Sequence, residues 1–96
     1  MTGFVLSPAA QADLDGIWDY TAARWNADQA DRYINGIRDA CYDLAAGKRV
    51  SRPVDVREGY RKLLVGSHTL FFKPDAAGLI VIVRVLHQRM DVSKHL

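Results

Sequence analysis

Residues 79–86 constrain the fold more than any other part of the chain. The segment reads Leu-Ile-Val-Ile-Val-Arg-Val-Leu, which is apolar at all positions but one and rich in β-branched side chains. Such side chains favour a pleated sheet, and a run this apolar is typical of a central strand. We expect Val81, Val83 and Val85 to face inward, because the opposite choice would bury Arg84 against helices without an evident partner.

A β-hairpin is predicted directly before this strand. Residues 60–65 and 68–73 both have strand-like sequences, and the two residues between them, Gly66-Ser67, form a glycine-first loop that suits a type II′ turn. A two-residue loop fixes the register of the strands that it joins. The expected cross-strand pairs are Val65–His68, Leu64–Thr69, Leu63–Leu70, Lys62–Phe71, Arg61–Phe72 and Tyr60–Lys73.

Two amphipathic helices are predicted before the hairpin. A short apolar strand at residues 4–6 leads into Ser7-Pro8, where serine can cap free amides and proline is tolerated at the first helical position. Asn26 begins a second helix, which ends near Gly47. The apolar positions, spaced three and four residues apart, are Ala10, Leu14, Ile17, Trp18, Thr21 and Trp25, followed by Ala30, Ile34, Ile37, Cys41 and Leu44. Residues 47–59 show no periodicity and are expected to form a loop.

The predicted fold class is α+β, with the element order βααβββ. An antiparallel-dominated sheet carries a two-helix hairpin on one face. The chain has 96 residues, and a chain of this length can build one hydrophobic core. We therefore expect a single domain over residues 1–96.

Two helices can cover only one face of a sheet, so the other face is expected to be bare. It would display Tyr60, Lys62, Lys73 and Arg84 beside Leu64, Phe71, Ile80, Ile82 and Leu86. This combination of cations and aliphatic surface favours a face that a partner protein covers. Two alternatives remain open at this point. The tail, residues 87–96, could fold across the face, or the side-chain parity of the last strand could be shifted by one residue.

Charge is divided unevenly along the chain. Residues 1–46 have a balance of −4, and residues 47–96 have a balance of +6. A cationic half favours an anionic partner, which could be a nucleic acid or an acidic protein surface, although the two halves could also attract each other.

Several classes of protein are excluded or disfavoured. Cys41 is the single cysteine, so an internal disulfide is impossible. No apolar run approaches the ~18 residues that would cross a bilayer, and the first residues lack the pattern of a secretion signal. We expect a cytoplasmic protein without a membrane partner. His68, His87 and His95 are widely spaced and Cys41 lies on a core stripe, so no metal or cofactor is expected.

Four separate segments, in order and in spacing, resemble the ParE toxin family of the RelE/ParE superfamily. They are Leu6-Ser7-Pro8-Ala9-Ala10 through Ile17-Trp18-Asp19-Tyr20, Arg24-Trp25 through Tyr33, Gly59-Tyr60-Arg61-Lys62-Leu63 through Phe72, and Val83-Arg84-Val85-Leu86-His87 through Asp91. The resemblance implies the βααβββ fold. It also implies the toxin of a type II toxin–antitoxin pair, which inhibits DNA gyrase by binding and is neutralised by a ParD-like antitoxin in a hetero-oligomer.

The resemblance also directs the choice of candidate site residues. The family's toxic determinants are generally placed in the last strand and the tail. The candidates for target contact are Arg57, Arg61, Arg84, His87, Arg89 and Met90. The candidates for antitoxin contact are Trp18, Tyr33, Lys62, Phe71, Ile80 and Ile82. No catalytic residue and no sequence-specific nucleic-acid contact is expected.

Two other functions are kept as alternatives. RelE-like relatives cleave messenger RNA on the ribosome, and here Lys62, Arg61 and Arg84 could stabilise the phosphorane charge while His87 acts as acid or base. This chain lacks the tyrosine near the C-terminus that many such nucleases use, which disfavours that function. The chain could also be a decayed toxin that is retained only as a partner for its antitoxin.

Overall fold

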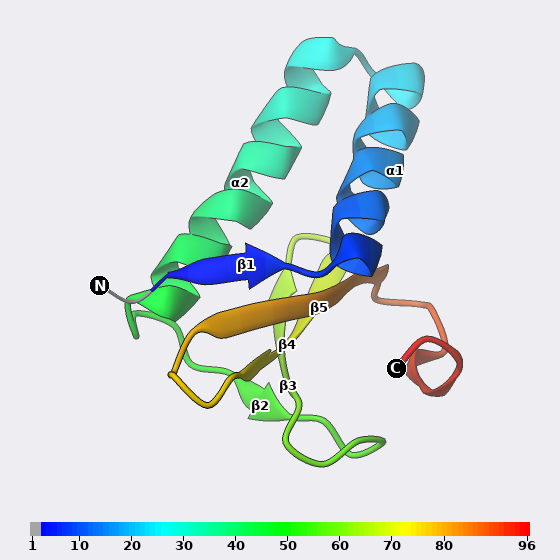
Figure 1. Cartoon of the computed structure of the whole chain (residues 1–96). Helices are drawn as coiled ribbons and strands as arrows, with labels where there is room; N and C mark the ends of the chain where they lie inside the picture. Colours follow the sequence, from blue (N-terminus) through cyan, green and yellow to red (C-terminus); the bar gives the residue numbers. More distant parts are fainter. Residues whose placement is uncertain (1–2) are drawn as a thin grey trace.

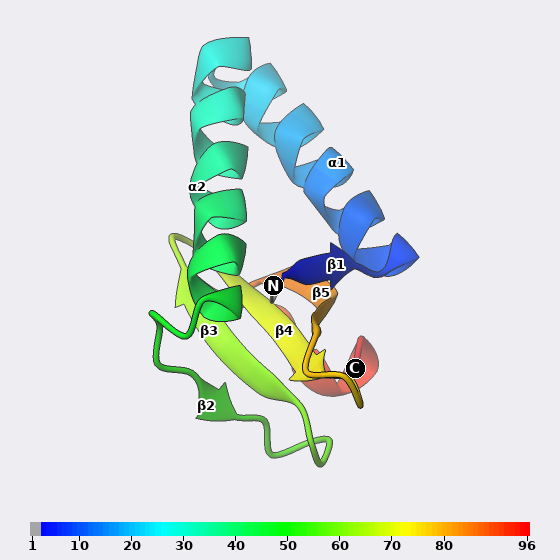
Figure 2. The ribbon, with the colours of Figure 1, turned by 60° about the vertical axis from the view of Figure 1, so that its left-hand side comes forward.

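The structure is a computed structural model that describes residues 3–96. Its five strands form one sheet in the order β1-β5-β4-β3-β2, with both α-helices on one side (Figures 1 and 2). The elements are β1 (Phe4–Leu6), α1 (Pro8–Arg24), α2 (Ala27–Ala45), β2 (Arg52–Pro53), β3 (Arg61–Val65), β4 (His68–Pro74), β5 (Ile80–His87) and the short 3₁₀ helix η1 (Val92–Lys94). The predicted α+β class and the order βααβββ are confirmed, and β2 and η1 are additions.

The strand pairing agrees with an antiparallel-dominated sheet. β1 runs parallel to β5, and the other three pairings are antiparallel. Figure 2 shows α1 and α2 leaning together as a hairpin whose connection projects beyond the strands. No helix within the described range 3–96 is long and apolar enough to cross a membrane.

The hairpin register follows from its turn. Five of the six predicted β3–β4 pairs, from Arg61–Phe72 to Val65–His68, are present in the structure. Gly66 has a φ of +60°, a left-handed conformation that a glycine adopts without steric cost. The sixth predicted pair does not belong to the ladder because Tyr60 precedes β3, although the Lys73 ammonium lies 5.2 Å from the centre of the Tyr60 ring.

Side-chain caps place the two helices. The Ala10 amide donates to Ser7 Oγ at 3.0 Å, and the Gln29 amide donates to Asn26 Oδ1 at 2.8 Å. These caps satisfy amides that have no partner inside the helix. Trp25 was predicted to continue the apolar stripe of α1, but its side chain is 68% exposed, since the helix ends at Arg24.

The main core lies between the helices and the sheet. Its buried members are Ala10, Leu14, Ile37, Ala40, Cys41, Leu44, Leu70, Phe72, Ile82 and Val85. The predicted core role of Cys41 is confirmed, and burial raises the pKa of its thiol to about 11. A thiol with so high a pKa is protonated and unreactive at neutral pH.

A β-bulge in β5 makes part of the predicted side-chain parity wrong. Phe71 pairs with Arg84 but Phe72 pairs with Ile82, so Val83 is an extra residue. After the bulge, Val85 faces the helices as predicted. Before it, the alternation is reversed: Ile82 is fully buried in the main core and Ile80 packs against that core. Val83, which was expected to face the helices, packs on the opposite side of the sheet.

The centre of the second face is covered by the chain itself, so the expectation of a bare face is wrong there. A second cluster of buried residues contains Val54, Tyr60, Phe71 and Leu86. Val92 and Leu96 of the C-terminal segment, residues 88–96, pack against it. The alternative in which the tail folds across the face is therefore correct. Figure 1 shows this segment turning back beside β5.

Candidate interaction groove along helix α1

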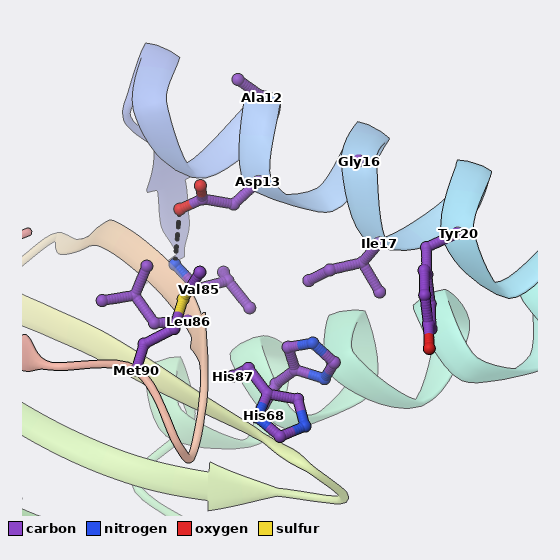
Figure 3. Close-up of a pocket in the computed structure, with 10 residues that line it drawn as sticks. All are labelled: Ala12, Asp13, Gly16, Ile17, Tyr20, His68, Val85, Leu86, His87 and Met90. Atoms are coloured by element: carbon purple, nitrogen blue, oxygen red, sulfur yellow. Dashed lines mark hydrogen bonds between the residues drawn. The ribbon is translucent and has the colours of Figure 1, made fainter.

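A groove with a volume of about 460 Å³ lies between α1 and the end of β5. Figure 3 shows α1 along one wall and Met90 with the last residues of β5 along the other. Its lining residues are Ala12, Asp13, Gly16, Ile17, Tyr20, His68, Val85, Leu86, His87 and Met90. The small side chains of α1 explain the hollow, because a Cβ atom added at Gly16 would have no neighbour within 4 Å.

A second hollow of about 310 Å³ continues the groove toward the end of α1. The two hollows share Tyr20, His68 and His87, and the second one extends to Trp25. Tyr20 and Trp25 are 66% and 68% exposed, and Met90 is 46% exposed. We call the two hollows together the α1 groove. Exposed aromatic and thioether side chains along one continuous groove are typical of a protein interaction site.

Two histidines and a tyrosine form the floor between the two hollows. The Tyr33 hydroxyl lies 2.6 Å from His68 Nδ1 and accepts a hydrogen bond from the Ser67 amide at 3.0 Å. The His68 and His87 rings meet edge to face with centres 5.4 Å apart. Burial, and then the neighbouring His87, lowers the pKa of His68 below its ordinary value. When His68 is neutral and carries its proton on Nε2, Nδ1 accepts a hydrogen bond from the Tyr33 hydroxyl, and both groups are satisfied.

Asp13 closes the other end of the groove. Arg84 donates to both of its carboxylate oxygens, from Nε at 2.8 Å and from Nη2 at 2.9 Å. The Val85 amide also donates to Asp13 Oδ2 at 2.9 Å, as Figure 3 shows. The hydrogen bonds that Arg84 donates to Asp13 are the main cause of the raised pKa of Arg84. The partner that the sequence did not reveal for Arg84 is therefore a side chain on the first helix.

The sequence order explains why Asp13 reaches β5. β1 pairs with β5 only as far as Leu6–Ile82, and Ser7 then binds the carbonyl oxygens of Ile82 and Val83. Beyond that point, no strand formed by residues 3–96 lies beside this edge of β5. Asp13, in the second turn of α1, supplies the acceptor for the next amide along this edge. The Asp13 side chain thus takes the place that a neighbouring parallel strand would occupy.

Comparison with known proteins identifies the family. The family model for the ParE toxin of the type II toxin–antitoxin system parDE matches residues 4–92. Toxin ParE1 from Mycobacterium tuberculosis is 52% identical over 94 residues, which cover 97% of this chain and 96% of the relative. The chain belongs to the ParE toxin family. Toxin ParE1 from Caulobacter vibrioides is 36% identical, over 100% of this chain and 99% of the relative.

Two solved structures share the fold of this ParE-family chain. One is a chromosomal ParDE toxin–antitoxin system from P. aeruginosa, with a TM-score of 0.79, 23% identity, and coverage of 91% of this chain and 96% of that chain. The other is a RelBE2 toxin–antitoxin complex from Mycobacterium tuberculosis, with a TM-score of 0.66, 22% identity, and coverage of 91% and 98%.

The structure divides the residues that were predicted to contact the target of the ParE toxin. His87 and Met90 line the α1 groove, and Arg89 is exposed beside them. The other three are engaged within the chain. Arg84 binds Asp13, Arg61 donates two hydrogen bonds to Ser51, and Arg57 donates one to the Leu96 carbonyl oxygen.

The residues predicted to contact the antitoxin are also separated. Phe71 lies on the second face as predicted, but it is buried there, at 2% exposure. Ile82, at 0% exposure, and Ile80 lie at the main core instead, so their expected place on that face is wrong. Lys62 lines a separate hollow that lies beside β2 and β3.

The other two predicted antitoxin contacts lie on the helices. Tyr33 lies at the groove floor, where its hydroxyl binds His68. The Trp18 indole donates to Asp31 at 2.9 Å and ties α1 to α2.

Sequence reasoning missed the α1 side of the groove. Asp13 and Tyr20 lie outside the apolar stripe that was predicted for α1 and were not among the candidate site residues. Gly16 offered a signal, because a glycine inside a helix is unfavourable unless packing or close approach requires it. Its position between Asp13 and Tyr20 marks the open face of the helix.

Proposed function

We propose that this ParE-family protein is a toxin that inhibits DNA gyrase by binding it, and that a ParD-like antitoxin neutralises it by occupying the α1 groove. The observation that carries the proposal is the groove, along which Tyr20, Trp25 and Met90 are exposed. An apolar groove of this kind suits the apolar face of an amphipathic helix. Membership of the ParE family supports a stable hetero-oligomer with an antitoxin.

The geometry suggests how occupation of the groove would block the target. His87 and Met90 line the groove and also belong to the predicted target contacts. Arg89 lies between them in the sequence and is exposed. A helix seated in the groove would cover the first two and crowd the third. Antitoxin and gyrase would then compete for the same part of the toxin, which in this proposal acts in the cytoplasm.

The arrangement of the cations supports inhibition by binding rather than catalysis. Cleavage of RNA requires cations that converge on one phosphate. Arg61 binds Ser51 next to β2, at one edge of the sheet. Arg84 binds Asp13 on α1, toward the other edge. Lys62 belongs to the hollow beside β2, and His87 belongs to the α1 groove. Lys62 and Arg84 flank Phe71 in one cross-strand row, but Arg84 and Arg61 are already bound within the chain, so the RelE-like alternative receives less support.

Two assays run in parallel test the proposal. Purified protein is added to a gyrase supercoiling reaction and to translating ribosomes with a defined message. We expect loss of supercoiling, an intact message, and recovery of supercoiling when the antitoxin is added first. A cleaved message with unaffected supercoiling would establish the nuclease instead. A correctly folded protein that changes neither reaction would support the decayed toxin.

A further inference from the structure

The ion pair between Asp13 and Arg84 connects the α1 groove to the C-terminal segment. We propose that Asp13 is a positioning residue, which acts through Arg84 to hold the C-terminal segment in the orientation that presents Arg89 and Met90 to the target. The role in target binding rests on the proposed function. The role in holding the segment is independent of it and is measured separately below.

The Arg84 guanidinium group binds both Asp13 and the C-terminal segment. Arg84 uses Nε and Nη2 for the two oxygens of Asp13, and its remaining nitrogen, Nη1, donates to the His95 carbonyl oxygen at 3.3 Å. The guanidinium group is planar, so fixing two of its nitrogens also fixes the direction of the third. The carboxylate on α1 thereby sets where the end of the C-terminal segment is bound.

The Asp13 carboxylate holds both sides of the turn that carries the exposed residues Arg89 and Met90. On one side, the Val85 amide of β5 donates to Asp13 directly. On the other side, His95 is bound through Arg84. Arg89 and Met90 lie between these two attachment points. Their position relative to α1 therefore depends in part on the Asp13 side chain, which is separated from Arg84 by 71 residues in the sequence.

The ion pair between Asp13 and Arg84 is partly shielded from solvent. The side chains of Arg84 and Asp13 are 23% and 15% exposed. Ion pairs that are fully exposed contribute little, whereas bidentate and partly buried pairs are stronger. A second attachment, from Arg57 to Leu96, and the packing of Val92 and Leu96 hold the far end of the segment.

This arrangement reverses the role first expected for Arg84. A target contact requires a cation that can bind an anionic partner, but this guanidinium is already bound to a carboxylate. If Arg84 contacted the target directly, removal of the Asp13 charge would free it, and inhibition would be retained or become stronger. If Asp13 positions the segment, the same change would weaken inhibition. The two roles therefore predict opposite results for one substitution.

The test is the substitution Asp13→Asn in the full chain. The amide keeps one oxygen that can accept the Val85 hydrogen bond, but it loses the charge and the second acceptor for Arg84. We expect faster hydrogen exchange at the His95 and Leu96 amides, with unchanged exchange at the core amide of Leu70. We also expect gyrase inhibition to weaken roughly tenfold, the factor that corresponds to one charge-assisted hydrogen bond.

The matched control is Asp15→Asn, two residues further along α1. Asp15 is exposed and, within the described part of the chain, accepts a hydrogen bond from Gln11 alone, so its loss should change neither measurement. Unchanged exchange at His95 and Leu96 in Asp13→Asn would overturn the proposal, and so would inhibition that is equal to or stronger than that of the unchanged protein.

Two further results separate this proposal from the proposed function. If the unchanged protein does not inhibit gyrase, the proposed function fails together with the role in target binding, and the exchange data still decide whether Asp13 holds the segment. If Asp13→Asn loosens the core at Leu70, Arg84→Lys replaces it, because lysine keeps the charge but cannot bind both oxygens and His95. Arg84→Lys should then loosen His95 and Leu96 alone, and protection equal to that of the unchanged protein would refute the positioning role.

Discussion

Replacement of Tyr20 by alanine tests the α1 groove directly. The Tyr20 side chain lines both hollows of the groove and is 66% exposed in the free protein. A partner helix seated in the groove would cover it. We therefore expect Tyr20→Ala to weaken antitoxin binding while it leaves the fold unchanged.

The size of the effect follows from the area that becomes covered. An aromatic side chain presents about 150–250 Å², so covering the exposed 66% of Tyr20 removes about 100–160 Å² from water. At about 25 cal/mol per Å², this corresponds to about 2.5–4 kcal/mol. Alanine keeps part of the contact, and about 2 kcal/mol of binding free energy should be lost, which is a factor of about 30 in Kd.

The measurement is titration calorimetry of the protein with the ParD-like antitoxin that is proposed as its partner. Tyr42→Ala is the matched control, because Tyr42 is also a largely exposed tyrosine, at 59%, but lies on α2 outside the groove. Thermal unfolding of both variants confirms that each is folded. A Kd for Tyr20→Ala within twofold of the Kd for the unchanged protein, or an equal loss in Tyr42→Ala, would refute the assignment of the groove.

Three further predictions concern the fold. Gly66→Ala should destabilise the protein by about 1–3 kcal/mol more than Gly78→Ala in denaturant unfolding, because both glycines have positive φ but only at Gly66 would the new Cβ meet another side chain, Tyr33 Oη at 2.9 Å; equal losses would contradict the close approach. Ile82→Asp should unfold the protein, as seen by circular dichroism, because a carboxylate would lie unpaired in the main core; a folded variant would show that Ile82 is not essential to that core. The folded state lowers the pKa of His68, so the unfolded chain binds more protons, and stability should fall as pH decreases below 6.5, the ordinary pKa of histidine; His68→Gln should reduce this pH dependence, and a slope identical to that of the unchanged protein would contradict it.

The elements that the sequence predicts well are those whose signals are local. Gly66-Ser67 is a two-residue turn, and it fixes five cross-strand pairs of the hairpin before any distant contact is considered. Ser7 and Asn26 cap the helices that directly follow them. The stripe from Ala30 to Leu44 identifies the buried side of α2, because apolar spacing alone defines one side of a helix.

The candidate site was less predictable, because its parts meet only in the folded chain. Asp13 is a charged residue outside the predicted apolar stripe of α1, yet it binds Arg84 and Val85, more than 70 residues away. Tyr20 is off the stripe and lines a groove whose other wall comes from β5 and Met90. His87 was selected from the sequence and does lie in this groove. Tyr33, which lines the same part of the groove, comes from α2.

What the sequence alone determined is the two α-helices, four of the five strands, their order, and the hairpin register, since caps, turns and periodic apolar positions act over a few residues. Only the tertiary structure decided which side chains of β5 face the helices, because the bulge at Val83 reverses an alternation that the sequence pattern shows as unbroken. It also decided what covers the second face: Val54 and the C-terminal segment meet Phe71 there because burying that apolar surface is favourable, whichever part of the chain supplies the cover.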